Sequence, residues 1–137
     1  MNNADMHREM HRMFNERDFD GIRAGMTEDF IFVDRPRAVE LDRDAFVAWM
    51  MEWTSAMSDA CVTEARYIDG GTSSIALFVG RGTHDGNFGP MPASGNEMHF
   101  DLCEVFMYDD AGCVTGGEVY YDMATVMAQA QVAAASS

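Results

Sequence analysis

RGTHDGNFGPMPASGNEMHF, residues 81–100, is the stretch that decides the fold. Its two ends read as strands, and glycine and proline are concentrated between them. Glycines stand at positions 80, 82, 86, 89 and 95, and prolines at 90 and 92. Glycine allows sharp bends, and proline stiffens a loop that needs no ladder hydrogen bond. The stretch therefore predicts two strands joined by a stiff, bent loop.

The same stretch is a poor phosphate loop or metal site. GRGTHDG has Asp85 where GxGxxG needs its third glycine, and no helix follows to meet a phosphate. His84 and His99 form only a weak metal candidate with Asp85. His7 and His11 lie four residues apart, but arginine follows the first histidine where the zinc-protease motif has glutamate. Histidines so near a chain end are usually solvated, so we expect no metal.

Elements on both sides of the loop can be predicted from the period of the apolar residues. The N-terminal part predicts two helices, a strand over 29–34, a connection over 35–44 and a helix over 45–57. The period then changes to that of strands, over 61–69, 72–86, 96–110 and 113–122, before a short helix over 123–131. We expect residues 130–137 to fray.

This order predicts an α+β fold, in which a curved antiparallel or mixed sheet wraps around N-terminal helices. Such a sheet closes into a cone with an apolar interior, and cones of this kind commonly hold a small ligand. The length of 137 residues fits one domain, covering 1–137.

Charge and composition exclude several classes of partner. The net charge is −14, and all nine basic residues are arginine. A surface of this sign repels nucleic acids and anionic membranes. No apolar run approaches the roughly 20 residues that span a bilayer, and the polar N-terminus predicts a cytoplasmic protein. The three cysteines form no CxxC pair, which favours free thiols.

Asp122 is the first candidate for chemistry. Strand alternation places it on one face with Tyr120 and Glu118. If that face is concave, burial and a second carboxylate would raise the pKa of Asp122 and prepare it for acid/base work. The alternative is that Asp122 is the N-cap of the last helix.

Other polar candidates have weaker support. His84 could bind a substrate oxygen or shuttle a proton, or it could anchor the loop. His99 and Glu104 lie five apart on one strand and so face opposite sides, which means that at most one of them can line the cone. We expect Asp34 to be a turn residue.

Large apolar residues on the predicted helices and first strand could form the wall of a cavity, although ordinary core is the favoured interpretation of each. The residues concerned are Phe14, Phe32, Trp49, Met50 and Trp53.

GTHDGNFGPMPASG between two long strands, and YYD at the end of the last strand, resemble the SnoaL-like polyketide cyclases of the NTF2-like superfamily. The resemblance covers roughly residues 6–129. It implies that the loop lies at the mouth of the cone, that the pocket needs no cofactor, and that the chain forms a homo-oligomer. It also implies intramolecular aldol chemistry, with Asp122 as the acid/base, and its register favours Glu104 over His99 as a polar residue of the pocket or of an interface.

The predicted function is therefore an enzyme of polyketide cyclase or ketosteroid isomerase type, a lyase or isomerase. Asp122 would move a proton beside a carbonyl of an apolar ligand, while His84 or Tyr120 would stabilise the enolate oxygen. Epoxide hydrolysis is disfavoured, because the strand SSIALFV lacks the Arg-x-Asp pair of those enzymes. The remaining alternative is a ligand-binding or oligomerisation module without activity.

The strand over 97–107 also predicts a homodimer or a higher homo-oligomer. Residues of both parities are apolar along it, whereas a strand with one wet face should alternate more cleanly.

Overall fold

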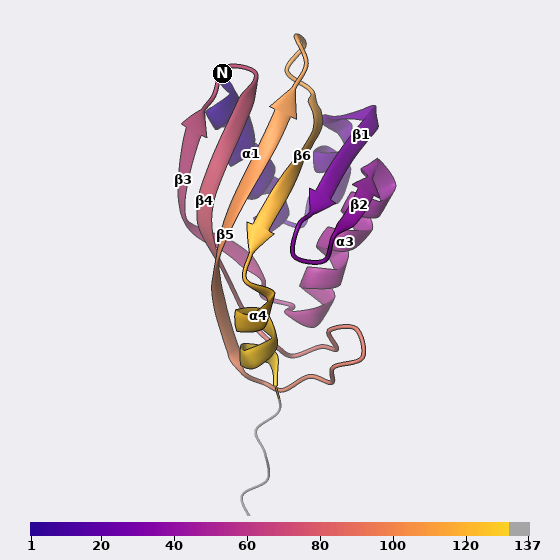
Figure 1. Cartoon of the computed structure of the whole chain (residues 1–137), viewed down its shortest axis with the longest axis vertical. Helices are drawn as coiled ribbons and strands as arrows, with labels where there is room; N and C mark the ends of the chain where they lie inside the picture. The colour runs from indigo at the N-terminus through magenta and orange to yellow at the C-terminus, as the bar shows by residue number, and fades with distance from the viewer. Residues whose placement is uncertain (132–137) are drawn as a thin grey trace, which may run out of the picture.

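A six-stranded mixed sheet forms one layer of the molecule, and three helices lie on one of its faces (Figure 1). The computed structural model describes residues 1–131. The helices are α1 (Asn3–Asn15), α2 (Phe19–Ala24), α3 (Arg43–Ala56) and α4 (Met123–Ala130). The strands are β1 (Met26–Asp34), β2 (Val39–Asp42), β3 (Cys61–Asp69), β4 (Ser73–Thr83), β5 (Glu97–Tyr108) and β6 (Val114–Tyr121). The predicted α+β class is thereby confirmed.

The strand order is β2-β1-β6-β5-β4-β3, in which β1 and β6 are parallel and all other neighbours are antiparallel. The last four strands form the expected meander. The fourth helix packs against the beginning of β5, where Val126 and Ala130 join the buried cluster that contains Trp53 and Phe100 (Figure 1). The predicted fraying of the tail concerns mainly residues 132–137, which lie outside the described residues.

The strand β2 is absent from the sequence-based prediction, which treated 35–44 as a connection. A tight turn with Ala38 at φ +55° reverses the chain after β1, and Val39–Asp42 then pairs with Ile31–Asp34. Only Leu41 of this strand is buried. Four residues with one inward side chain leave no readable alternation, so the pairing with β1 determines the element.

The loop at residues 84–96 closes the wide end of the sheet against α3. Gly86 donates its backbone N–H to Ala56 at 3.0 Å. A Cβ on Gly86 would lie 1.9 Å from the carbonyl oxygen of Ser55, so only glycine permits this approach. Further along the loop, the Phe88 ring lies 5.1 Å from that of Trp53. The loop therefore forms part of the wall around the sheet's inner face.

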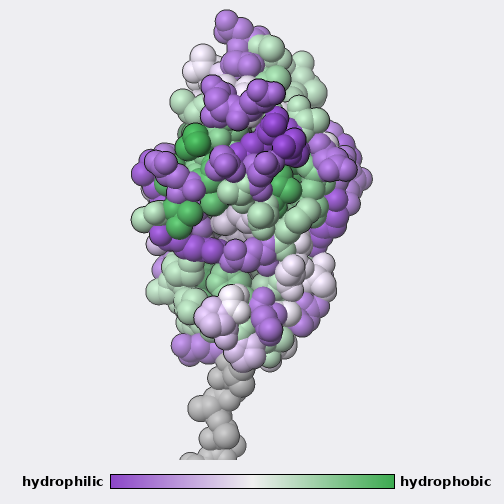
Figure 2. Space-filling view, turned by 90° about the vertical axis from the view of Figure 1, so that its right-hand side faces the viewer, coloured by the Kyte–Doolittle hydropathy of each residue, from purple (hydrophilic) through white to green (hydrophobic). Residues whose placement is uncertain are grey.

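The edge made by β1, β2 and α3 shows hydrophilic residues interspersed with hydrophobic ones (Figure 2). Most large apolar side chains lie instead between the sheet and the helices, in two adjoining clusters. None of the helices within residues 1–131 has the length and apolar character needed to cross a membrane.

Candidate functional site

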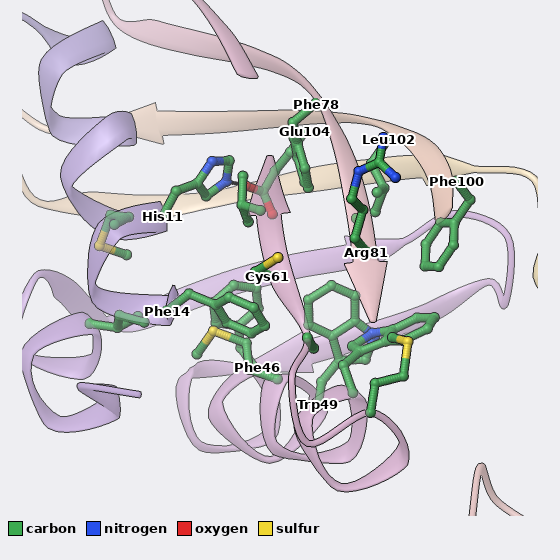
Figure 3. Close-up of a pocket in the computed structure, with 18 of the residues that line it drawn as sticks. His11, Phe14, Phe46, Trp49, Cys61, Phe78, Arg81, Phe100, Leu102 and Glu104 are labelled. Atoms are coloured by element: carbon green, nitrogen blue, oxygen red, sulfur yellow. Dashed lines mark hydrogen bonds and ion pairs between the residues drawn. The ribbon is translucent and has the colours of Figure 1, made fainter. Parts of the chain in front are cut away.

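An apolar cavity of about 90 Å³ lies between α1, α3 and the inner face of β3, β4 and β5 (Figure 3). Its walls are mainly aromatic and methionine side chains. Four of the lining residues have ionisable side chains: His11, Cys61, Arg81 and Glu104. The cavity is therefore an apolar chamber with very few polar groups.

Glu104 is the carboxylate of this chamber, and its two oxygens differ. It lies on β5 with 5 % of its surface exposed. Its Oε1 is 2.9 Å from His7 Nε2 and 2.7 Å from His11 Nε2. Its Oε2 has no hydrogen-bond partner among the described residues, although Glu104 lines the cavity. One oxygen is thus held by two imidazoles, and the other is free to meet a ligand.

The two imidazoles are oriented by hydroxyl groups on their far sides. His7 Nδ1 lies 2.6 Å from Ser74 Oγ, which in turn lies 2.8 Å from Tyr108 Oη. His11 Nδ1 lies 2.8 Å from Tyr67 Oη. These contacts satisfy the second nitrogen of each ring, so both rings are fixed with Nε2 towards the carboxylate. We call His7, His11 and Glu104 the histidine–glutamate cluster.

The charge of the cluster follows from its hydrogen bonds. Burial would raise the pKa of Glu104, but the hydrogen bonds from His11 and His7 lower it to about 2. Burial lowers the pKa of His7, against the effect of the neighbouring carboxylate. At neutral pH the cluster therefore contains an ionised carboxylate beside a neutral His7.

Local periodicity explains how the cluster assembles. His7 and His11 lie four residues apart on α1, so both face the same side of the helix. Glu104 shares its strand parity with Phe100 and Phe106, which are buried on the inner face of β5. The helix packs across β3 and β4, which brings the three side chains together.

The cluster is also the one group of three potential metal ligands within residues 1–131, with ligand atoms no more than 4.8 Å apart. Metal–ligand bonds of about 2.0–2.2 Å in a tetrahedral site separate ligand atoms by roughly 3.3 Å. The two N···O distances of 2.7 and 2.9 Å are shorter than this and match hydrogen bonds. We therefore assign these contacts as hydrogen bonds.

Comparison with known proteins agrees with this fold. The sequence profile of the SnoaL-like polyketide cyclase family matches residues 4–130. The chain belongs to this family. No curated protein matches the sequence.

Several solved structures share the SnoaL-like fold. A candidate polyketide cyclase from Xanthomonas campestris superposes with a TM-score of 0.82 at 20 % identity, over 94 % of this chain and 96 % of that one. AclR, a candidate hydroxylase from Streptomyces galilaeus, gives 0.81 at 18 % identity, over 92 % of both chains. A ketosteroid isomerase-like protein from Catenulispora acidiphila, in complex with trimethylamine, gives 0.72 at 14 % identity, over 88 % and 87 %. These likenesses establish the NTF2-like, ketosteroid isomerase-like fold.

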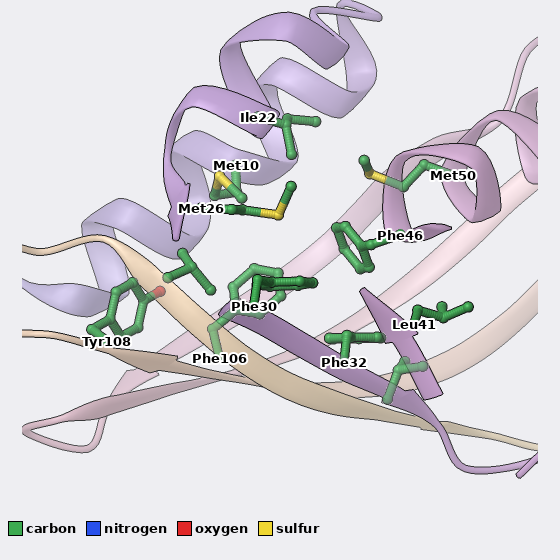
Figure 4. Packing of buried hydrophobic residues seen from close by; sticks show 12 residues of the cluster. Met10, Ile22, Met26, Phe30, Phe32, Leu41, Phe46, Met50, Phe106 and Tyr108 are labelled. Carbon is green, nitrogen blue, oxygen red and sulfur yellow. The ribbon is translucent and has the colours of Figure 1, made fainter. Parts of the chain in front are cut away.

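Four of the predicted site residues of this SnoaL-like chain line the cavity: Phe14, Trp49, Trp53 and Glu104. Phe32 is fully buried but belongs to the adjoining core cluster, where it packs near Phe46 (Figure 4).

The prediction that Glu118 and Tyr120 line the concave side of the sheet is wrong. Glu118 and Tyr120 point to the outer face of the sheet, where Tyr120 Oη donates to Glu118 Oε1 at 3.1 Å and Arg35 pairs with the same carboxylate at 2.6 Å. Val119, between them in sequence, is fully buried. The apolar Val119 and the largely apolar Tyr121 face inward, and alternation then places Glu118 and Tyr120 outside.

Asp122 also lies outside the cavity, so its predicted placement in the cone is wrong. It is the exposed N-cap of α4 and accepts hydrogen bonds from Thr125 Oγ1 at 2.9 Å and Ala124 N at 3.0 Å. These bonds lower the pKa of Asp122, whereas the prediction required a raised one. Its catalytic role stays a prediction without a contact to the cavity.

His84 lies at the base of the 84–96 loop and is fully buried. Its Nδ1 is 2.8 Å from Ser94 Oγ, and its backbone bonds to Asn96 and Gly95 across the loop. It is not among the residues that line the cavity. The structure therefore places His84 as an anchor of the loop, with Nε2 buried and unpaired.

Sequence reasoning missed His7, His11 and the burial of Asp34. The expectation of solvated histidines is wrong, because positions 4, 7, 10 and 11 follow helical spacing and form the buried face of α1. That spacing was a readable signal. Asp34 gave no such signal; it is fully buried and accepts from Trp49 Nε1 and Tyr121 Oη, each at 2.9 Å.

Proposed function

We propose that the cavity binds a small carbonyl compound and that Glu104 removes a proton from the carbon beside the carbonyl, without a cofactor. The observation that carries this proposal is the free Oε2 of a buried, ionised carboxylate in an apolar chamber. In the proposed step the C–H bond breaks, its electrons pass into the enolate, and the proton binds Glu104 Oε2.

The proton then leaves Glu104 in one of two ways. Its return to another carbon is an isomerisation. In the aldol reaction of a cyclase the enolate carbon attacks a second carbonyl, and the proton passes from Glu104 to the alkoxide that forms. Once protonated, Glu104 is a poorer acceptor for the His11 N–H. An enolate oxygen that lies beside Glu104 Oε1 would share this N–H, because Tyr67 keeps the His11 ring in place.

The pKa of Glu104 limits the class of substrate from which it could remove a proton. A general base works best when its pKa is near the operating pH, and a carboxylate of pKa about 2 is a weak base. It is suited to a carbon acid that is already activated, such as a carbon between two carbonyls. A 1,3-dicarbonyl compound is therefore the proposed substrate class.

The size of the cavity sets a second limit. A cavity of about 150 Å³ in another protein holds one benzene molecule, and this cavity is about 90 Å³. A polycyclic ligand does not fit inside it. The substrate is therefore small, or only its reacting end enters the chamber.

Hydrogen–deuterium exchange tests the proposal without knowledge of the natural substrate. Small β-keto esters and ketones are incubated in D₂O with the protein, and loss of the α-hydrogen signal is followed by NMR. We expect the wild type to accelerate exchange and Glu104→Gln to reduce the acceleration about 10²–10⁴-fold.

Glu118→Gln is the matched control, because it neutralises a carboxylate on the outer face of the neighbouring strand. It should keep the wild-type rate. Exchange no faster than in buffer for every compound would remove the enzymatic proposal, and full activity in Glu104→Gln would assign the base elsewhere.

A non-catalytic ligand-binding module is the second candidate. It is favoured by the same low pKa of Glu104, because a carboxylate that holds its charge tightly can serve as a recognition group. Ligand-induced stabilisation without exchange would support it.

We also propose that the chain forms a homodimer through the outer face of the sheet. Strand register places Ile68, Ile75 and Val105 side by side in one row, and Leu77 beside Cys103 in the next. Polar residues of the Arg35–Glu118 pair lie to one side. A row of apolar residues across three strands is typical of a surface that another chain covers.

A further inference from the structure

The cavity combines many aromatic rings with a single negative charge. Seven of the residues that line it are aromatic and three are methionine. The aromatic ones are Phe14, Phe46, Trp49, Trp53, Phe78, Phe100 and Phe106. The faces of such rings carry negative electrostatic potential, so they attract cations as well as apolar groups.

The carboxylate of Glu104 is hydrogen-bonded on one oxygen only. His7 and His11 both contact Oε1 through N–H groups, and burial lowers the pKa of His7. Arg81 also lines the chamber, but its side chain is half exposed and pairs with Glu64 at 2.9 Å. A close-up of the cavity shows the Arg81 guanidinium turned away from the tryptophan wall (Figure 3).

An ionised carboxylate in an apolar chamber is costly unless a charge of opposite sign lies next to it. Here two N–H donors satisfy Oε1, whereas Oε2 has no partner among the described residues. A donor that brings both a positive charge and an N–H would satisfy this oxygen.

The aromatic wall is already fixed in place. Trp49 Nε1 donates to the buried Asp34 at 2.9 Å, which sets the orientation of the indole ring. The Trp49 and Trp53 rings pack edge to face at 6.2 Å. A rigid wall loses little entropy when it binds a small ligand, so even a ligand of few atoms can be held.

We infer that this cavity binds small organic cations, namely alkylammonium ions of about four to six non-hydrogen atoms, a number that the volume of about 90 Å³ admits. The ammonium N–H donates to Glu104 Oε2, and the alkyl groups lie against the aromatic wall. This binding goes beyond the proposed proton transfer and does not depend on it. Such a cation would compete with a carbonyl substrate for the same oxygen.

Two probes of the same shape test the inference. tert-Butylammonium and tert-butanol have the same number of non-hydrogen atoms and differ in charge. Binding is measured by calorimetry and by thermal unfolding at moderate salt, so that weak attraction to the acidic surface is screened. We expect the cation to bind at least about 10-fold more tightly than the alcohol, because charge pairing and cation–π attraction act together. At a concentration 100 times its Kd it should raise Tm by roughly 5 °C or more.

Glu104→Gln should weaken binding of the cation about 10-fold or more, while Glu118→Gln should leave it unchanged. Equal affinity for the two probes, no binding of the cation, or full affinity in Glu104→Gln would each overturn the inference. If Glu104→Gln does not fold, the two probes on the wild type still decide. Because binding is read without turnover, binding of the cation without α-hydrogen exchange would retain this inference and remove the proposed function.

Discussion

At the scale of single residues, the proposed base is Glu104, whereas the sequence predicted Asp122 as the base and Glu104 only as a polar residue of the pocket. Asp122 lies outside the cavity as a helix cap, and Glu104 lines the cavity. We expect Asp122→Asn to keep its Tm within about 2 °C of the wild type and its rate of α-hydrogen exchange within about 2-fold, because Asn caps helices about as well as Asp. Thermal unfolding and the NMR exchange assay measure the two quantities. A loss of 100-fold with an unchanged Tm would return Asp122 to the mechanism.

The pH dependence of stability provides a second test of Glu104. Its pKa is about 2 in the folded chain, below the ordinary value of 4.5 expected after unfolding. Stability from this carboxylate is therefore complete above pH 4.5 and is lost as the pH falls from 4.5 to 2. The side chain of Glu104→Gln cannot titrate. The difference in free energy of unfolding between the wild type and this variant should therefore shrink by on the order of 3 kcal/mol across this range. Urea unfolding at several pH values measures the gap. Parallel curves would contradict the assigned ionisation.

The sequence predicts some of these residues and not others for definite reasons. The aromatic wall can be read from helical spacing, which predicts Trp49 and Trp53. On β5, alternation separates His99 from Glu104, and the choice of Glu104 rests on the family resemblance. Asp122 was misplaced because alternation gives two faces without saying which is concave. The orientation is decided by what packs against each face. On β6 the buried side chain is Val119, so its neighbours in sequence point outward.

At the scale of elements, the polar contacts of α1 fasten it to the sheet. Ser74 Oγ on β4 lies between His7 Nδ1 at 2.6 Å and Tyr108 Oη at 2.8 Å. Ser74→Ala leaves His7 Nδ1 buried without a partner, which costs about 1–3 kcal/mol. We expect Tm to fall by roughly 3–10 °C and the amide protons of α1 to exchange faster.

Ser73→Ala is the control for this prediction. Ser73 is the neighbouring residue of β4, and its side chain makes no hydrogen bond with the described residues. Its replacement should change stability by less than about 0.5 kcal/mol. Similar effects of the two substitutions would show that Ser74 has no special part in docking the helix.

Elements with a long apolar period were predictable, and the short one was not. The helix over 45–57 and the four strands of the meander are present with small shifts at their ends. The strand β2 exists because β1 offers it a free edge for pairing. This strand follows Pro36 and two arginines and has four residues. That is too short for alternation to predict a strand that depends on pairing with β1.

At the scale of the whole molecule, the outer face of the sheet and the net charge have opposite effects on dimerisation. The row of Ile68, Ile75 and Val105 favours association through burial of apolar surface. Two copies that each carry a charge of −14 repel one another. Salt screens the repulsion and leaves the apolar attraction in place. Dimerisation should therefore strengthen as the ionic strength rises.

Sedimentation equilibrium at micromolar concentration tests this dimer. We expect a mass of about twice 15.2 kDa for the wild type, with tighter association at about 0.5 M than at about 0.05 M salt.

Ile75→Lys places a charge in the middle of the apolar row and should yield monomers, since an unpaired charge buried in an interface is costly. Met51→Lys adds the same charge at an exposed position of α3, away from the sheet, and should remain dimeric. A wild type that stays monomeric at both salt concentrations would rule out this interface, and equal dissociation of both variants would attribute the effect to charge alone.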